Sequence, residues 1–144
     1  MTYIIRKIDE KDYSSIAAII RDDLGYENSS NFDVARRLKN IRNHKDYTTF
    51  VAEQNKEIVG FIGLMRGFAY EIDGSYIRVA ALAVKKEHQN RGIGNRLLEE
   101  AEKFAKKSDA RTIMLNSGIQ RTNAHDFYER RGYIKKGYSF KKSI

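Results

Sequence analysis

The sequence predicts an α/β fold, a single domain over residues 1–144 in which a mixed central β-sheet is flanked by helices. Its 144 residues are enough to bury one hydrophobic core. Short β-prone runs alternate with segments whose apolar residues recur at helical spacing, and the expected order is β-α-α-β-β-β-α-β-α-β. The chain contains no proline and no low-complexity tract or repeat, so nothing marks a linker between domains.

The N-terminal segment is expected to form a strand followed by a helix. Residues 3–8 form a short β-prone run. Asp9 and Asp12 stand three residues apart, which is a capping-box pattern at the start of a helix over residues 10–24. Gly25 is expected to end that helix, because glycine adopts the left-handed conformation of a helix C-terminus.

A second helix and a hairpin follow. Ser29 or Ser30 can cap a helix that runs to about His44, and the strands over 47–54 and 57–66 are separated by a two-residue turn. The apolar residues of the helix recur at helical spacing and are expected to face inward: Phe32, Ala35, Leu38 and Ile41.

The second half of the chain is expected to continue with a long strand over 75–85 and an amphipathic helix ending near Lys107. A strand over 111–116, a short helix over 122–131 and a last strand over 133–141 complete the order. Because a helix connects the strands at 75–85 and 111–116, these two strands should be parallel, and the sheet should therefore be mixed.

Composition excludes several classes of site. Without cysteine the chain can have no disulfide framework, thiolate metal site or cysteine nucleophile. The histidines His44, His88 and His125 lack metal-ligand spacing, so no metal is expected. No apolar run approaches the roughly 20 residues that span a bilayer. No signal-peptide core is present. The expected setting is the cytoplasm, with no membrane partner.

The net charge of +8 is concentrated in the second half of the chain. Residues 1–72 carry 11 basic and 11 acidic side chains, whereas residues 73–144 carry 16 and 8. This excess fits a nucleic acid, a phosphate-rich cofactor or a basic surface that aids solubility. No helix-turn-helix, aromatic RNA-binding strand or zinc module is recognisable, so no nucleic-acid partner is expected.

A glycine-containing turn lies between the strand at 75–85 and the following helix. Free backbone N–H groups at a helix N-terminus bind anions, and Gly92 and Gly94 would let a pyrophosphate approach the backbone. A dinucleotide-binding fingerprint would need a third glycine where Leu97 stands, and a Walker loop would need Gly-Lys-Ser/Thr. A helix that merely begins with two glycines is the remaining alternative.

The turn and a C-terminal motif resemble the GNAT superfamily of N-acetyltransferases. Its turn pattern, Gln/Arg-x-x-Gly-x-Gly/Ala after a strand ending in Leu-x-Val, is matched by Gln89–Gly94 after Leu82–Val84. Its second pattern, Asn-x-x-Ala-x-x-Phe-Tyr-x-x-x-Gly-Phe/Tyr, is matched over residues 124–133. The leading Asn of that pattern falls on Arg121, and Asn123 stands two residues away.

The resemblance implies a GNAT-like acyl-CoA fold that binds acetyl-CoA as a cosubstrate. Backbone amides of the turn would hold the pyrophosphate, and the strand end would pair with the pantetheine arm. Tyr128 would protonate the departing CoA thiolate, since a phenol is protonated at neutral pH. The cofactor-binding residues expected on this basis are Leu82, Ala83, Val84, Gln89, Asn90, Arg91, Gly92, Ile93, Gly94, Asn95 and Asn123.

The expected reaction is direct transfer of the acetyl group from acetyl-CoA to a primary amine, because no cysteine or Gly-x-Ser-x-Gly elbow offers a nucleophile. Many family members carry a glutamate near Ala80. The candidate bases that remain are Glu71, Asp73, Tyr76 or a water molecule.

The expected acceptor is a small-molecule amine bound by residues 24–42 and 67–75. The alternatives are a peptide or protein amine and a non-catalytic acyl-CoA-binding module. A homodimer is compatible with the sequence.

Overall fold

The computed structural model describes residues 2–144 in two compact units, Met1–Met114 and Leu115–Ile144, which are treated separately below as the first and second units. The first unit contains the sheet and three of the helices. The second contains the last helix and the C-terminal segment. That all 144 residues form one domain stays a prediction.

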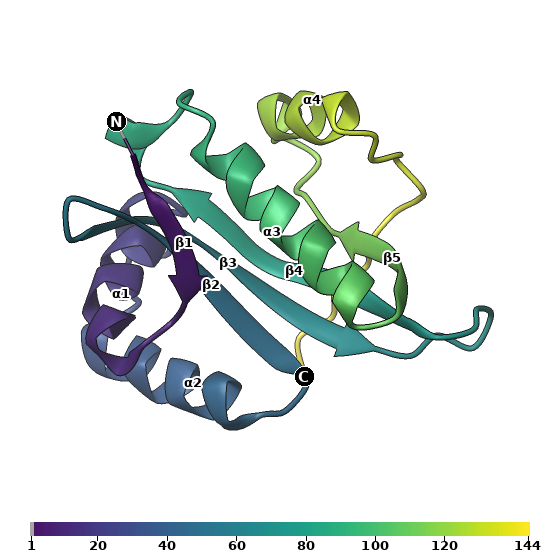
Figure 1. Ribbon diagram of the computed structural model, residues 1–144, viewed down its shortest axis with the longest axis horizontal. Coiled ribbons are helices and arrows are strands. Elements are labelled where there is room, and N and C mark those ends of the chain that lie inside the picture. Colours follow the sequence, from purple (N-terminus) through teal and green to yellow (C-terminus); the bar gives the residue numbers. More distant parts are fainter. Residues whose placement is uncertain (1) are drawn as a thin grey trace. The chain divides into compact units, whose positions relative to one another are not determined.

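The sheet is mixed, as predicted, but it has five strands among the described residues where six were expected. Its strands lie in the order β1-β2-β3-β4-β5, and the first three neighbouring pairs are antiparallel. β5 follows a crossover helix and runs in the same direction as β4 (Figure 1). The strands are β1 Ile4–Lys7, β2 Tyr47–Gln54, β3 Glu57–Gly67, β4 Ser75–Val84 and β5 Ala110–Leu115.

Helices α1 (Tyr13–Asp22) and α2 (Asn31–Asn43) cover one face of the sheet, and α3 (Ile93–Lys107) covers the other (Figure 1). The predicted capping box before α1 is present, although its first turn is the 3₁₀ helix Glu10–Asp12. At α2 the Ser30 hydroxyl accepts the Asp33 N–H at 3.0 Å, which identifies Ser30 as the cap. No helix within residues 2–144 is both long and apolar enough to cross a bilayer.

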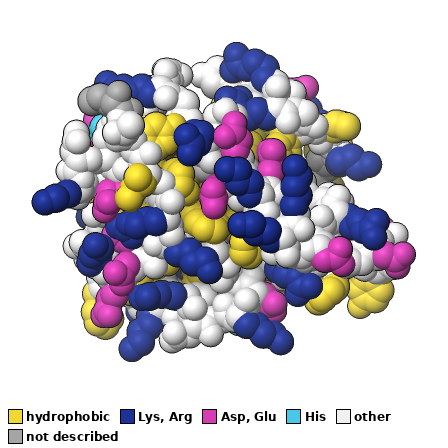
Figure 2. Space-filling view, in the orientation of Figure 1, with side chains coloured by type: hydrophobic (Ala, Val, Ile, Leu, Met, Phe, Trp, Pro, Cys, Tyr) yellow, Lys and Arg dark blue, Asp and Glu magenta, His cyan; other side chains and the backbone are white. Residues whose placement is uncertain are grey.

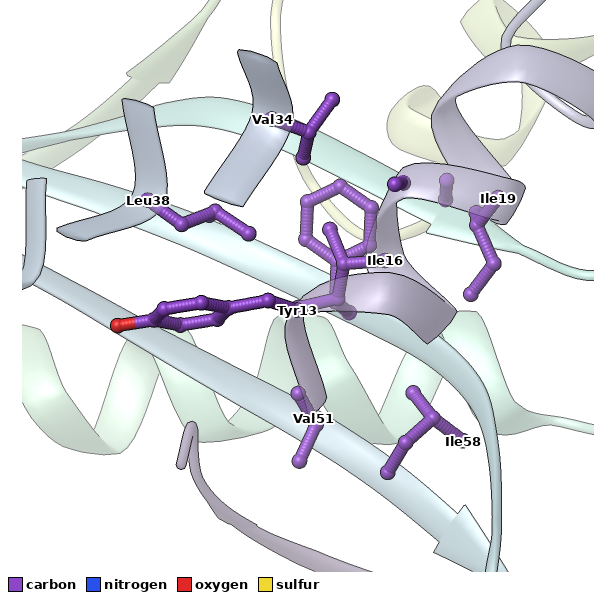
Figure 3. Close-up of a cluster of buried hydrophobic side chains, with 10 residues drawn as sticks. Tyr13, Ile16, Ile19, Val34, Leu38, Val51 and Ile58 are labelled. Carbon is purple, nitrogen blue, oxygen red and sulfur yellow. The ribbon is translucent and has the colours of Figure 1, made fainter. Parts of the chain in front are cut away.

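The α1/α2 face is packed by one cluster of buried side chains (Figure 3), which includes Tyr13, Ile16, Ile19, Val34, Leu38, Val51 and Ile58. Of the four α2 residues expected to face inward, Leu38 is buried, whereas Ala35 and Ile41 are partly buried. Phe32 was wrongly predicted to be buried and is 76% exposed. Val34 and Leu38 lie on the face of α2 that packs against the sheet. Phe32 stands two residues before Val34, which corresponds to a rotation of about 200° around the helix, so its side chain lies on the opposite face.

The α3 face is packed as its periodicity predicts. Phe104 of α3 meets Phe50 of β2 edge to face at 6.0 Å between ring centroids. The side chains that α3 buries are Ile93, Leu97, Leu98, Ala101 and Ala105. Because Ile93 and Leu97 are almost fully buried, the start of α3 is fixed rigidly at the end of β4.

The second unit contains α4 (Thr122–Arg130), as predicted, but not the predicted last strand over 133–141. These residues have no regular structure, and Ile134, Tyr138 and Phe140 are 80%, 84% and 93% exposed. Lys135, Lys136 and a glycine interrupt the apolar alternation here. Lysine and glycine both disfavour strands, so the β-prone residues at the ends of the segment are not enough to make it a strand.

Candidate functional site

The end of β4 departs from regular pairing at one residue. Gly63 is paired with Ala81 and Leu64 with Val79, so Ala80 is an extra residue in β4, a β-bulge. Ala80 is exposed. The resemblance places a proton-accepting glutamate near this position, but a methyl group cannot accept a proton, so Ala80 cannot take that role.

Beyond the bulge, β4 approaches β3 closely. Gly60 is paired with Val84, and a Cβ on Gly60 would lie 2.9 Å from the carbonyl oxygen of Ala83. Glycine is therefore needed for this close approach. Ala83 is buried in the α1/α2 cluster, whereas Leu82 and Val84 are half-buried. The three residues predicted to contact the pantetheine arm are thus the last three of β4, and they are held by the close packing of β4 against β3.

The loop after β4 is tied to neighbouring elements by two hydrogen bonds. The Gln89 side chain donates to the Val84 carbonyl at 3.0 Å, and the Lys86 N–H donates to Asp23 Oδ1, also at 3.0 Å. Gln89 therefore holds the loop against the strand end, a role that the sequence motif did not reveal. Asp23 connects the loop to the C-terminal end of α1.

Gly92 begins α3 in an unusual way. An N-cap residue normally has an extended backbone and a side chain that accepts a backbone N–H. Gly92 has φ 84° and ψ 3°, which is left-handed, and it provides no side-chain cap. A Cβ built on it would meet no atom within 4 Å, so the space above it is open. Preceded by Asn90 at φ 63°, it presents the start of α3 to solvent.

This arrangement suits an anion held by backbone groups. The helix dipole and the first N–H groups of α3 favour negative charge at its N-terminus. Ile93 is 2% exposed, so it can contact a ligand only through its backbone. Asn90 and Arg91 are exposed, Gly94 lies in the first helical turn, and the Asn95 side chain donates to Glu99 at 3.1 Å.

Tyr3 belongs to this turn although the sequence gave no sign of it. Its hydroxyl donates to the Gly92 carbonyl at 3.2 Å, across 89 positions of the chain. The Arg96 guanidinium lies 5.8 Å from the Tyr3 ring centroid. No local pattern predicts a contact between residues so far apart. Together these contacts brace the left-handed residue from the side of the N-terminal segment.

The basic surface is not one uniform patch. On the face where α3 lies, lysine and arginine side chains are interspersed with acidic ones (Figure 2). Arg96 is close to Glu99, at 3.8 Å. On this face the two signs of charge are mixed, and Arg91 and Arg96 add positive charge near the start of α3.

In the second unit, Tyr128 lies on α4 between two aromatic rings. Its ring contacts Phe127 and Tyr133 edge to face, at centroid distances of 5.3 and 6.0 Å. Burial raises the pKa of the Tyr128 phenol, and the nearby Arg121 charge opposes this only in part. The hydroxyl is therefore protonated at neutral pH and is able to donate a proton.

The same residues also end the helix. Tyr133 N–H donates to the Tyr128 carbonyl and Gly132 N–H to the Glu129 carbonyl, both at 3.1 Å. With Gly132 at φ 88°, this is a Schellman motif, and the contact between the Tyr128 and Tyr133 rings is its usual apolar contact. Part of the second motif is thus explained by folding alone.

The polar residues near the start of α4 have different surroundings. Arg121 is the residue before the helix and makes no side-chain cap, and Asn123 is exposed in the first turn. His125 Nε2 lies 2.8 Å from the Gly118 carbonyl, which fixes the ring against the preceding loop. That Asn123 contacts the cofactor stays a prediction.

The candidate bases are not equivalent. Glu71 and Asp73 are exposed in the β3–β4 loop. Tyr76 is paired with Gly67, and a Cβ on Gly67 would lie 2.8 Å from the Tyr76 ring, which therefore covers the glycine. An aromatic ring over a cross-strand glycine is a common stabilising arrangement, so the position of Tyr76 has a structural explanation.

One further group of polar side chains lies beside the loop after β4. Glu57, Glu87 and His88 bring ligand-type atoms within 4.8 Å of one another. Lys85 Nζ already contacts Glu57 at 2.6 Å and lowers the pKa of that carboxyl by its hydrogen bond and charge. The sequence expectation of no metal stays a prediction.

Open hollows occur in both units of the described chain. One in the first unit, of about 410 Å³, lies in the region expected to bind the acceptor, and one in the second unit, of about 430 Å³, is lined by Asp126, Glu129 and Arg130 of α4. The first is lined by Gly25, Tyr26, Glu27, Asn28, Ser29 and Arg37.

Comparison with known proteins adds independent information. Residues 6–133 match the family model described as the Acetyltransferase (GNAT) family. An aminoalkylphosphonate N-acetyltransferase of Salmonella typhimurium is 27% identical over 132 residues, covering 92% of this chain and 82% of the relative.

Two solved structures share the fold. A GNAT family acetyltransferase of Staphylococcus aureus superposes with a TM-score of 0.83 at 31% identity and full coverage of both chains. An aminoglycoside N-acetyltransferase in complex with CoA superposes with a TM-score of 0.86, covering 99% of this chain and 95% of the other. At 10% identity, the second likeness concerns the fold alone.

Proposed function

Because the chain belongs to the acetyltransferase (GNAT) family, whose model matches residues 6–133, we propose that it acetylates the primary amine of a small molecule with acetyl-CoA. Membership of this family makes it an acetyl-transferring enzyme. The proposal concerns which residues hold acetyl-CoA, how the transfer proceeds and what kind of amine is used.

The observation that carries the proposal is the start of α3. A left-handed glycine with open space above it precedes a helix whose first turn has no side-chain cap. A phosphate can approach such a backbone closely, and folding alone does not require the arrangement. The pyrophosphate of acetyl-CoA would bind here, and the arm would extend along Leu82–Val84.

The transfer is a direct displacement. The nitrogen of the neutral amine attacks the thioester carbonyl carbon, and a C–N bond forms as the C–S bond breaks. The Val84 N–H is the proposed donor to the carbonyl oxygen, where negative charge develops. The CoA thiolate takes a proton from Tyr128, and the excess proton of the amide nitrogen passes to a base or to water.

The kinetics should be sequential, with both substrates bound before a product leaves. The chain contains no cysteine, and His125, the histidine beside the second motif, is held by the Gly118 carbonyl. No residue therefore stands out as a nucleophile that would carry the acetyl group.

A small acceptor is supported by a relative. The Salmonella relative is named for aminoalkylphosphonates, which are small molecules with amino groups. No feature of the described residues favours a peptide acceptor. Location in the cytoplasm, absence of a nucleic-acid partner and homodimer formation stay predictions.

The test is to incubate the protein with acetyl-CoA and a panel of primary amines, measuring thiol release and the N-acetyl product by mass spectrometry. Initial rates over a grid of both substrates should give intersecting double-reciprocal lines. Parallel lines together with an isolable acetylated enzyme would overturn direct transfer. Tight acetyl-CoA binding without turnover of any amine would favour a non-catalytic acyl-CoA-binding module.

A further inference from the structure

We infer that the amine acceptor also carries an anionic group, such as a carboxylate or phosphonate, and that Arg37 binds this group in the hollow beside the α1–α2 loop. The inference rests on the proposed function, because it specifies the acceptor class of the same enzyme. It depends on the position of the hollow, on the order of the loop and on the charges that line it.

The loop that lines the hollow follows a residue bonded to the segment just after β4. The loop begins at Gly25, directly after Leu24, which packs against the cluster that contains Ala83. Asp23, one residue earlier, accepts the N–H of Lys86, two residues beyond Val84. The loop is therefore anchored where the acetyl group is proposed to lie. All of these contacts are within the first unit.

The loop is held in one conformation by several hydrogen bonds. Arg21 donates to the Ser29 carbonyl at 2.9 Å and to Asn31 Oδ1 at 2.7 Å. Tyr26 N–H donates to the Ile20 carbonyl at 3.1 Å, and Ser29 N–H to the Tyr26 carbonyl at 3.0 Å. The hollow has a volume of about 410 Å³ and is open to solvent. A preorganised loop lowers the entropy cost of binding.

Two adjacent arginines of α2 differ in what surrounds them. Arg36 pairs with Asp33 at 3.4 Å. Arg37 lines the hollow and makes no salt bridge within residues 2–144, although its charge, like that of Arg36, helps to lower the pKa of the Asp33 carboxyl. A guanidinium presents several N–H donors in a planar fork that matches a carboxylate or phosphonate. Arg37 is thus the available cation of the hollow.

Glu27 adds a negative charge from the loop side of the same hollow. A purely anionic ligand would be repelled by Glu27, and a purely cationic one by Arg37. A zwitterion satisfies both, with its ammonium toward Glu27 and its anion toward Arg37. An aminoalkyl acid has these charges, and it loses the ammonium proton before attack on the thioester.

The experiment compares 3-aminopropylphosphonate and γ-aminobutyrate with the uncharged 3-aminopropan-1-ol, each corrected for the fraction of neutral amine. We expect kcat/KM to be about 10 to 100-fold higher for the anionic amines, as charged hydrogen bonds of this kind provide. Arg37→Gln should remove the preference by lowering kcat/KM for the two anionic amines to about the value for aminopropanol. Arg36→Gln, on the same helix, should change neither value.

Equal kcat/KM for anionic and uncharged amines, or an unchanged preference in Arg37→Gln, would overturn the inference while the proposed function stands. If no amine at all is acetylated, the proposed function fails, and calorimetry then decides the inference separately. Binding of 3-aminopropylphosphonate that Arg37→Gln weakens at least tenfold and Arg36→Gln preserves supports an anion site. No binding, or equal binding by all three proteins, overturns it.

Discussion

Gly92 and Gly132 share a left-handed backbone and open space around the missing Cβ, but they stand at opposite ends of helices. Gly132 follows α4, where a left-handed glycine closes a Schellman motif. Gly92 precedes α3, where an extended residue with a capping side chain is the rule. The conformation of Gly132 is thus explained by helix capping, whereas that of Gly92 is not, which is why the pyrophosphate site is proposed there.

The same contrast separates the two motifs as functional signals. In the turn after β4, the exposed glycine and the exposed loop residues add little to the core, so their pattern points to binding. In α4, the tyrosine, glycine and second tyrosine of the motif also stop the helix. Tyr128 therefore has a packing role and a proposed role as proton donor, and the variants below separate them.

The largest expected effect is that of Tyr128→Phe on turnover. Removing the hydroxyl keeps the ring and its contact with Tyr133, so stability should be nearly unchanged. Loss of a general acid typically lowers kcat by about 10²–10⁴-fold, while the Kd for CoA should stay the same. The measurements are steady-state kinetics with a working amine, CoA calorimetry and thermal unfolding.

A matched variant, Tyr133→Phe, keeps its ring and loses a hydroxyl in the same motif, and it should retain full turnover. Full activity in Tyr128→Phe would leave packing as the only role of Tyr128. The second motif would then be explained by folding, in contrast to the turn at Gly92.

The next effect compares Gly92→Ala with Gly132→Ala. Each places a Cβ in a left-handed residue, which costs roughly 1–2 kcal/mol of stability, so both variants should unfold at similar lower temperatures. Only Gly92→Ala should weaken CoA binding, raising the Kd by about 10 to 100-fold. Its methyl group would occupy the space proposed for the pyrophosphate, which is held there by charged hydrogen bonds. Calorimetry and thermal unfolding give the two readouts.

Gly25→Ala is a further control within the first unit, with φ 82° and no atom within 4 Å of the added Cβ. It should bind CoA as the unmodified protein does. Equal CoA affinity in Gly92→Ala and Gly25→Ala would place the pyrophosphate elsewhere.

Much of this fold could be predicted because local signals agreed with the final packing. The capping box at Asp9, the strand limits at Tyr47 and Gln54 and the apolar face of α3 depend on nearby residues. The prediction of a last strand was wrong, because Lys135 and Lys136 interrupt the apolar alternation. The prediction that Phe32 is buried was wrong, because an apolar residue at a helix start can lie on either face.

For the candidate site, the glycine turn was predictable because its conformation needs particular residues within a few positions. The bond from Tyr3 to Gly92 and the bond from Lys86 to Asp23 were not, because they join distant segments. The bulge at Ala80 depends on register between strands. Such features arise from tertiary pairing, which one sequence does not encode locally.

A third expected effect concerns pH. The rate should rise tenfold per pH unit below the pKa of the amine, since only the neutral amine attacks. Burial raises the pKa of Tyr128 above its ordinary value of 10.0, so the donor stays protonated over the neutral range. The rate should therefore not decrease until the pH exceeds about 10. A falling limb centred near pH 7 or 8 in kcat against pH would assign the acid to another group.

The smallest expected effect tests whether the loop after β4 needs its tie to the strand. Gln89→Leu removes the hydrogen bond to the Val84 carbonyl but keeps a side chain of comparable volume. One exposed hydrogen bond contributes about 0.5–1.5 kcal/mol, so the Kd for CoA should rise by roughly 2 to 10-fold with little change in unfolding temperature. Gln89→Glu also loses the donor and adds a negative charge beside the proposed phosphate site, so it should bind CoA more weakly than Gln89→Leu, and the difference should shrink as salt is added. If both variants bind CoA as the unmodified protein does, the open turn at Gly92 holds its shape without Gln89, and the bracing falls to Tyr3 and the buried start of α3.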